Sequence, residues 1–135
     1  MIVLDTHIWV WWVQNDSRLT AQHRQWLKDY EQDGLGLSII SCWEVAKLVE
    51  KNRLILPLSI NKWLDAALAY PGVQLLDLSI AIVVDSTQLN GFHSNLFDQF
   101  IVATARFYDC HLLTVDEKIL NYPDVKTLKI SQNNS

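Results

Sequence analysis

The sequence predicts an α/β domain in which a mostly parallel sheet of about five strands is covered by helices on both faces. Two observations predict this class. Short apolar runs with the composition of buried strands alternate with longer segments of helical periodicity. The chain also has 135 residues, 50% of them hydrophobic, which is enough for one domain with a sizeable core. We expect this domain to cover residues 1–130, with a frayed tail at residues 131–135.

Five short segments have the apolar composition of buried strands. Alternation of these segments with helices favours a parallel sheet, because each helix can then connect two strands across one face. Such strands read as continuous apolar runs rather than as alternating polar and apolar positions. The predicted strands, in order, are residues 2–4, 35–40, 73–76, 111–114 and 125–128.

In the first half of the chain, helix signals follow each of the first two strands. Residues 7–13 form a predicted helix rich in Trp, and Asp16 or Ser17 can cap a second helix over residues 19–31 that ends near Gly34. Ser41 is the predicted N-cap of a third helix. Glu44 follows it by three residues, which is the spacing of a capping box.

Four more helices are predicted in the second half. Pro57 and Ser59 open a helix that continues to residue 70, where Pro and Gly stop it. Ser79 caps a segment running to residue 89, whose apolar start has β-favouring composition but no alternation, so a helix is preferred. The last two helices cover residues 96–108, which have one apolar face, and residues 117–120.

Composition excludes several function classes. The longest apolar run, residues 80–84, is far shorter than the roughly 20 residues that cross a bilayer, and no signal-peptide pattern begins the chain. Cys42 and Cys110 match no zinc or redox spacing, which favours free thiols in a reducing cytoplasm. The net charge of −4 argues against broad, salt-driven coating of nucleic acid. We expect a cytoplasmic protein without a membrane partner.

Four acidic residues stand where α/β proteins place their active sites. Asp5 and Asp116 each follow a strand pattern, and Asp98 and Glu44 lie near the start of predicted helices. The carboxyl ends of parallel strands meet at one edge of the sheet, so these side chains can converge there. Oxygen ligands without a matching Cys or His cluster favour a hard divalent cation, Mg²⁺ or Mn²⁺.

Each of these acids also has a purely structural explanation. Asp5 and Asp116 could be N-caps of the helices that follow them, and Glu44 and Asp98 could complement the helix dipole from the first turn. These explanations do not predict that four acids recur together in one particular order along the chain.

The order of the motifs resembles that of a known family. The motifs are Leu4-Asp5-Thr6-His7, Ser41-Cys42-Trp43-Glu44, the segment from His93 through Asp98 to Ala105, and Leu113-Thr114-Val115-Asp116. Together they resemble the PIN-domain nucleases, and among them the VapC-type ribonuclease toxins of bacterial toxin–antitoxin pairs. The resemblance covers residues 1–128. Each motif is weak alone, but four in order at familiar separations are specific.

The resemblance implies a three-layer α/β/α fold and a Mg²⁺- or Mn²⁺-dependent endoribonuclease. It places the acidic site residues at Asp5, Glu44, Asp98 and Asp116. It also implies that the chain is a toxin held inactive by a cognate antitoxin protein, and that it forms homodimers.

General chemistry suggests a role for each acid. Hydrolysis of a phosphodiester requires an activated water and stabilisation of charge on the oxygens of the phosphate, and carboxylate-bound Mg²⁺ can supply both. We expect Asp5 and Asp98 to bind the metal, with Asp116 as a further ligand or a support. Glu44 is best placed to orient or deprotonate the attacking water.

The neighbours of the acids carry weaker expectations. Thr6 and Thr114 can donate hydroxyl contacts to the metal-binding carboxylates or to a substrate phosphate. Asn95 and Gln99 depart from the family pattern, which has an acid and an arginine at these positions; Asn95 can still hydrogen-bond water or phosphate. His7 is expected to be packed or hydrogen-bonded rather than catalytic.

Two function classes remain open at this point. The first is an active endoribonuclease, and the second is a PIN-like module that has lost activity and binds protein or RNA. Retention of all four acids favours the first. An aspartate-nucleophile phosphatase is disfavoured because it would need a second Asp two residues after Asp5, where the chain has His7. A flap nuclease would need extra threading elements for which the chain lacks room.

Overall fold

A computed structural model describes residues 1–130, so the predicted tail at residues 131–135 lies outside the described part. Four parallel strands form one sheet in the order β3-β2-β1-β4. Their bounds are β1 Ile2–Leu4, β2 Leu35–Ser38, β3 Val73–Leu76 and β4 His111–Leu113. The parallel sheet is therefore confirmed, with β1 and β2 at its centre.

The predicted fifth strand joins the sheet at one point. Within residues 125–128, Thr127 forms a single parallel bridge with Leu112, and the Leu112 N–H donates to the Lys126 carbonyl at 2.8 Å. Val125 is buried against the core while Lys126 is exposed. Leu128 packs against the other core, but the segment forms a single bridge with β4, which is too short a contact for a regular ladder.

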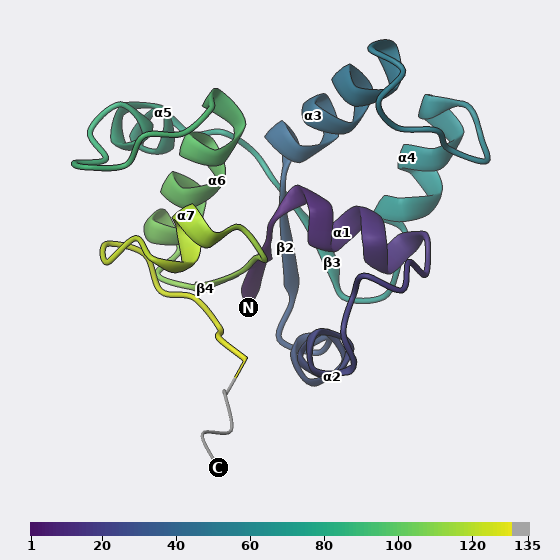
Figure 1. Cartoon of the computed structure of the whole chain (residues 1–135), viewed down its shortest axis with the longest axis horizontal. Coiled ribbons are helices and arrows are strands. Elements are labelled where there is room, and N and C mark those ends of the chain that lie inside the picture. Colours follow the sequence, from purple (N-terminus) through teal and green to yellow (C-terminus); the bar gives the residue numbers. More distant parts are fainter. Residues whose placement is uncertain (131–135) are drawn as a thin grey trace.

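Helices cover both faces of this sheet, as Figure 1 shows. Helices α1 and α4 lie on one side, α5, α6 and α7 lie on the other, and α3 sits beyond the end of β2. The three-layer α/β/α prediction is confirmed. The helix bounds are α1 Thr6–Val13, α2 Ala21–Tyr30, α3 Ile39–Glu50, α4 Ile60–Leu68, α5 Ile80–Ser86, α6 Leu96–Phe107 and α7 Glu117–Leu120.

The alternation of side chains along β1 produces two cores. Ile2 and Leu4 belong to a cluster that includes Trp9 of α1 and Trp63 of α4. Val3 points to the other face, in a cluster formed largely by α6 residues and the segment after α7. Because β1 is buried on both faces, its position and direction are strongly constrained. Its carboxyl end, which carries Asp5, is held by packing from both sides.

The start of α3 differs from the prediction. Ser38, not Ser41, is the N-cap: its hydroxyl accepts the Ile40 N–H at 3.1 Å, so β2 ends at Ser38 and the helix begins at once. Ser41 lies inside the first turn and is buried. Glu44 therefore falls in the second turn, where its side chain has no cap to bond. The predicted capping box is wrong, because an earlier serine meets the first free N–H groups.

Other helix ends shift by a few residues for local reasons. Helix α2 is capped by Thr20 rather than Asp16 or Ser17, because the Asp16 carboxylate is already bound by the Arg18 guanidinium at 2.8 Å. Helix α1 begins one residue earlier than predicted, at Thr6. Ser79 does cap α5 through the Ile82 N–H, but the helix ends at Ser86 instead of residue 89.

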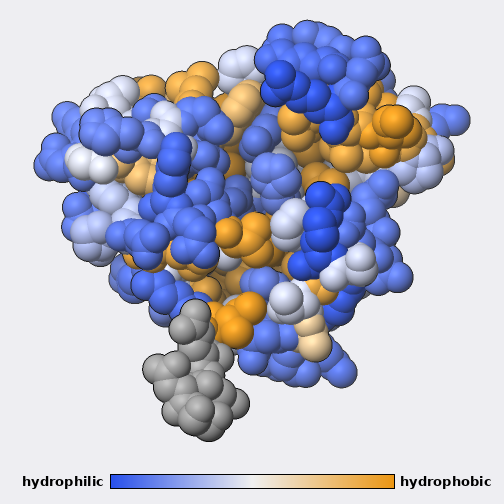
Figure 2. Space-filling view, viewed as in Figure 1, coloured by the Kyte–Doolittle hydropathy of each residue, from blue (hydrophilic) through white to orange (hydrophobic). Residues whose placement is uncertain are grey.

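Figure 2 shows apolar surface at the upper left, in the region of α5, and beside α3 and α4 at the upper right, with a mostly hydrophilic surface around α7. Ile55 and Leu58, which lie between these two helices in the sequence, are 88% and 47% exposed. Within residues 1–130, every helix is too short or too polar to traverse a bilayer.

Candidate active site

The four acids lie around the carboxyl ends of β1, β2 and β4. Asp5 follows β1 and is the N-cap of α1, while Asp116 follows β4 and is the N-cap of α7. Glu44 sits in α3, directly after β2, and Asp98 in the first turn of α6. The capping explanation of Asp5 and Asp116 is therefore confirmed, and in each residue the cap bond uses one carboxylate oxygen.

Asp5 is the most enclosed of the four. It is 3% exposed, and its Oδ1 accepts the Thr6 N–H at 2.8 Å. The Thr114 hydroxyl donates to Oδ2 at 2.6 Å and itself accepts the Asp116 N–H at 3.0 Å. Thr114 therefore connects the ends of β1 and β4 and fixes the orientation of the Asp5 carboxylate. This contact is possible because Leu4 and Leu113 pair in the sheet.

Asp98 is held by the loop that precedes α6. The Ser94 hydroxyl donates to its Oδ2 at 2.6 Å, and the Asn95 side-chain oxygen caps the helix by accepting the Asp98 N–H at 2.9 Å. The Gln99 amide donates to the Ser94 carbonyl at 3.2 Å. Asn95 thus acts in this structure as a helix cap, a role for which a neutral amide suffices. Ser94, which the sequence reasoning did not single out, is the residue that contacts the carboxylate.

Glu44 has an unsatisfied oxygen in the site. Its side chain is 9% exposed, and its buried Oε1 has no hydrogen-bond partner within the described chain. The nearby Thr6 hydroxyl donates to the Ser41 hydroxyl at 2.9 Å. Because a hydroxyl can rotate, Thr6 is also able to turn its proton towards Glu44. A buried carboxylate oxygen without a donor is costly, so this position is poised to accept a cation or a water.

Burial and mutual repulsion raise the pKa values of three acids. Burial raises the pKa of Asp5 from 3.8 to about 6, and the charge of Asp98 adds to this. Burial is also the main cause that raises the pKa values of Glu44 and Asp98. The charge of Asp98 further raises the pKa of Glu44, and the charge of Asp116 further raises the pKa of Asp98. Asp98 thus interacts with each of the other three acids, which shows that they share one electrostatic environment.

His7 is close enough to lower the pKa values of Asp5, Glu44 and Asp98. His7 was expected to be packed or hydrogen-bonded, but its side chain is exposed, with its ring 6.0 Å from that of Trp11. Its place in the first turn of α1, two residues after Asp5, turns the imidazole outwards beside the acids. That spacing was the available signal in the sequence, but a single His near a strand end does not reveal which residues surround it.

An open cavity of about 630 Å³ lies between Asp98 and Asp116. Its wall includes His93, Asn95, Gln99 and Lys118. The Lys118 backbone N–H donates to Asp116 Oδ1 at 2.8 Å, which fixes Lys118 beside this acid. The sequence reasoning missed Lys118 as a residue of the site, because a lysine on a short helix resembles any other solvated charge.

The donor set fits a hard cation bound by few protein groups. Among residues 1–130, no three His, Cys, Asp or Glu side chains are grouped closely enough to hold a metal by themselves. Mg²⁺ is usually bound by one or two carboxylates, with waters and phosphate oxygens as its other ligands. Here the raised pKa values and the unpartnered Glu44 oxygen mark negative charge that lacks compensation.

Comparison with known proteins agrees with the fold and with the family resemblance. The family model of the PIN domain matches residues 2–125. Ribonuclease VapC22 of Mycobacterium tuberculosis is 25% identical over 122 residues, which are 90% of this chain and 91% of the relative.

Two solved structures share the fold. The VapBC2 structure from Rickettsia felis, bound to a DNA fragment from its promoter, matches with a TM-score of 0.72 and 19% identity over 95% of this chain and 98% of that chain. The FitAcB structure from Neisseria gonorrhoeae matches with a TM-score of 0.68 and 21% identity over 96% of this chain and 97% of that chain. With the family model covering nearly the whole chain, these findings lead to one conclusion: the chain belongs to the PIN-domain family.

Proposed function

We propose that this protein is a Mg²⁺- or Mn²⁺-dependent endoribonuclease and the toxin of a toxin–antitoxin pair. The observation that carries the proposal is the position of Asp98, whose charge acts on Asp5 and Glu44 and is itself acted on by Asp116. Four acids in one field at the carboxyl edge of a parallel sheet suit a metal-centred site better than four unrelated caps. The similarity to a ribonuclease supports RNA as the substrate, which would place the protein in the cytoplasm.

Asp5, Asp98 and Asp116 are the proposed ligands of the metal. When bound, a divalent cation stabilises negative charge on the phosphate oxygens and lowers the pKa of a bound water. Thr114 keeps one Asp5 oxygen oriented, and Ser94 does the same for Asp98. These hydroxyl donors hold the carboxylates in place while they repel one another.

Glu44 is the proposed acceptor of the proton from the attacking water. Its Oε1 is free of hydrogen bonds within the described residues, and burial raises the pKa of its carboxyl. A raised pKa makes a carboxylate a better base near neutral pH, because the pKa then lies closer to the pH at which the enzyme works. Thr6 can donate to Glu44 or to a phosphate oxygen.

Partners follow from the proposed role. We propose a cognate antitoxin protein as the inhibitor and a homodimer as the working form. Large apolar side chains on α3, α5 and α6 are exposed, with Trp43 at 47%, Ile80 at 85% and Leu96 at 48%. Burial of this surface against a second copy would remove it from water. Light scattering of the purified chain measures the dimer directly, and a monomer at all concentrations contradicts it.

Substitution of the shared acid tests the activity. Asp98→Asn keeps the size of the side chain and an oxygen that can accept the Ser94 hydroxyl, but removes the charge. We expect cleavage of single-stranded RNA in Mn²⁺ to fall more than about 100-fold, beyond the usual effect of losing a group that only supports a ligand. Asp65→Asn, on an exposed position of α4, is the matched control and should cut like the parent. If the Asp98→Asn variant cleaves RNA as fast as the parent, the proposal that the four acids form one site is wrong.

The alternative, a PIN-like module without activity, is favoured by one observation: no three metal-binding side chains converge in residues 1–130. Thermal unfolding separates the two. A site that binds metal only when folded makes the melting temperature rise with Mn²⁺ concentration. A rise in the parent and none in the Asp98→Asn variant supports the enzyme. No rise in the parent at millimolar Mn²⁺, with no cleavage, supports the inactive module.

A further inference from the structure

The cavity beside Asp98 and Asp116 contains one strong positive charge within the described chain. Its wall holds two Asp side chains, and Lys118 is the one Lys or Arg among the described residues that line it. The backbone of Lys118 is tied to Asp116 at 2.8 Å, and its ammonium group is near enough to Asp98 to lower the pKa of that carboxyl. This cation therefore lines the same cavity as Asp98 and Asp116.

The Lys118 side chain is not committed to another contact. It is exposed, and none of the ion pairs or side-chain hydrogen bonds formed within residues 1–130 uses its ammonium group. By contrast, Lys126 is bound to Asp109 at 2.7 Å. A mobile ammonium beside a cavity of this size can pair with an anion that enters it.

The same cavity is also lined by neutral hydrogen-bonding groups. Asn95 and Gln99 carry amides, and His93 carries an exposed imidazole. Phosphate backbones are usually bound by such a mixture of a cation and polar side chains, which position the strand without reading its sequence. The wall also holds Asp98 and Asp116, so Lys118 is the charged side chain of this cavity that attracts a polyanion.

We propose that Lys118 binds a phosphate of the RNA strand in this cavity, next to the phosphate that is cut. This inference rests on the proposed ribonuclease function and adds to it the residue that holds the substrate. Lys118 acts on substrate affinity, whereas the acids act on the chemical step. Because the contact is made to the backbone, it is independent of the RNA sequence.

The Lys118→Gln variant tests this role in steady-state cleavage of a labelled oligouridylate. Loss of a hydrogen bond to a charged group should raise KM about tenfold. The value of kcat should stay close to that of the parent. The slope of log affinity against log salt should become shallower by about 0.7, which is the contribution of one phosphate contact on a single strand. Lys126→Gln, which removes a lysine already paired with Asp109, should change neither quantity.

A second variant excludes a merely structural effect. Gln99 lines the same cavity, so Gln99→Arg in the Lys118→Gln background returns a cation to it and should restore KM and the salt slope. A local unfolding around α7 would not be rescued in this way. If Lys118 acted only through the charge on Asp98, its loss would shift the acidic limb of the pH profile of kcat and leave the salt slope unchanged, which would overturn the proposal.

RNA binding by a variant that does not cleave it tests this inference separately from the proposed function. The Asp98→Asn protein keeps Lys118, so anisotropy of the labelled oligouridylate can be measured with it, alone and combined with Lys118→Gln. Weaker binding and a shallower salt slope in the double variant support the lysine contact even if the parent cuts no RNA. Equal binding by both proteins overturns the contact even if the parent is an active ribonuclease.

Discussion

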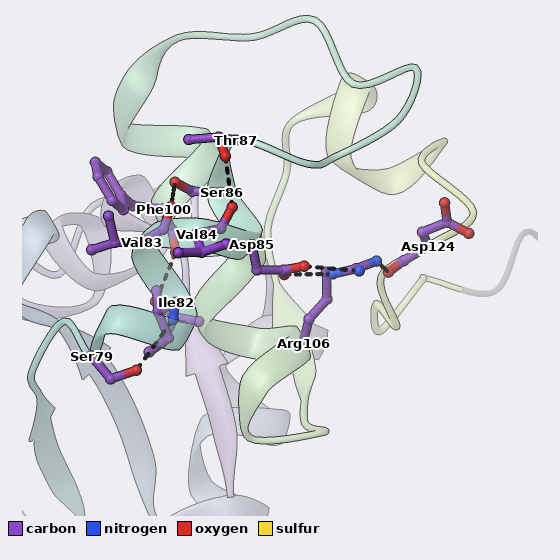
Figure 3. A network of polar contacts seen from close by, with 11 residues as sticks. Ser79, Ile82, Val83, Val84, Asp85, Ser86, Thr87, Phe100, Arg106 and Asp124 are labelled. Carbon is purple, nitrogen blue, oxygen red and sulfur yellow. Dashed lines mark hydrogen bonds and ion pairs between the residues drawn. The ribbon is translucent and has the colours of Figure 1, made fainter.

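Two clusters of charged side chains in this molecule have opposite arrangements. At the carboxyl edge of the sheet, Asp5, Glu44 and Asp98 are buried with no cation in direct contact among the described residues. At the far end of α6, Arg106 is fully engaged, as Figure 3 shows. It binds both oxygens of Asp85 at 2.8 and 3.1 Å and the Asp124 carbonyl at 2.8 Å.

The difference separates charges that hold the fold from charges that are available for chemistry. The hydrogen bonds from Arg106 to Asp85 raise the pKa of the guanidinium, which keeps Arg106 charged, and its contacts tie α5, α6 and the segment after α7 together. In the acid site the pKa values of the carboxyls rise instead, because burial and repulsion disfavour the charged forms. Such uncompensated charge is typical of functional sites.

Among substitutions that remove one contact from either cluster, Thr114→Val should have the largest effect. It keeps the shape of the side chain and removes the hydroxyl that donates to Asp5. We expect RNA cleavage to fall about 10- to 100-fold at neutral pH, as for other groups that orient a metal ligand. The Thr114 hydroxyl lowers the pKa of Asp5, so its loss should also move the acidic limb of the pH–rate profile upwards. Thr87→Val, at an exposed position after α5, is the control. A loss that does not depend on pH would contradict this role of Thr114.

The second effect concerns stability without metal. The pKa of Asp5 is raised from 3.8 in the unfolded chain to about 6, so the folded state binds this proton more tightly. The contribution of Asp5 to the free energy of unfolding is therefore greatest at low pH and is lost as pH rises through about 6. Between about pH 8 and about pH 5, Asp5 alone should add about 1.4 kcal/mol to the free energy of unfolding.

Urea unfolding in a chelator measures this change. Glu44 and Asp98 act in the same direction, because their pKa values are also raised. The Asp5→Asn variant, which cannot titrate at this position, should show a correspondingly smaller difference between the two pH values. The same pH dependence in the parent and the variant would show that Asp5 is not the buried, repelled group described above.

The smallest effect should come from breaking the ion pair between Arg106 and Asp85. Arg106→Gln removes a pair whose side chains are about a third exposed, at 33% and 30%, so solvent screening limits the loss of stability to about 1 kcal/mol. Cleavage of RNA should not change, because this cluster is separate from the acids. Chemical unfolding and a cleavage assay of one preparation test both statements. A double-mutant cycle with Asp85→Asn isolates the pair, and a large loss of activity would show that the two clusters are coupled.

Much of the fold was predictable because it depends on local patterns. The four strands and the order of helices follow from apolar runs and helical periodicity, and the family from four motifs in order. Helix ends were less predictable, because several residues compete for each cap. Ser38 displaced Ser41, and Thr20 displaced Asp16, whose carboxylate binds Arg18 instead.

The candidate site divides in the same way. Asp5 and Asp116 could be expected together from the sequence, since each lies between a strand of a parallel sheet and the helix that follows it. Ser94 and Lys118 could not be distinguished from ordinary polar residues, because their relation to Asp98 and Asp116 arises from loop geometry. His7 was expected to be packed or hydrogen-bonded, yet its position in the first turn of α1 leaves it exposed.

The sequence by itself determined the parallel α/β architecture and which acids belong to one edge of the sheet, because strand period and strand direction are local or nearly local properties. Only the tertiary structure decided how those acids are held and how they interact. Thr114 reaches Asp5 across 109 positions of chain, and the raised pKa values depend on burial by helices from both faces. Burial and electrostatic coupling are properties of packed neighbours, so they exist only once the layers have assembled.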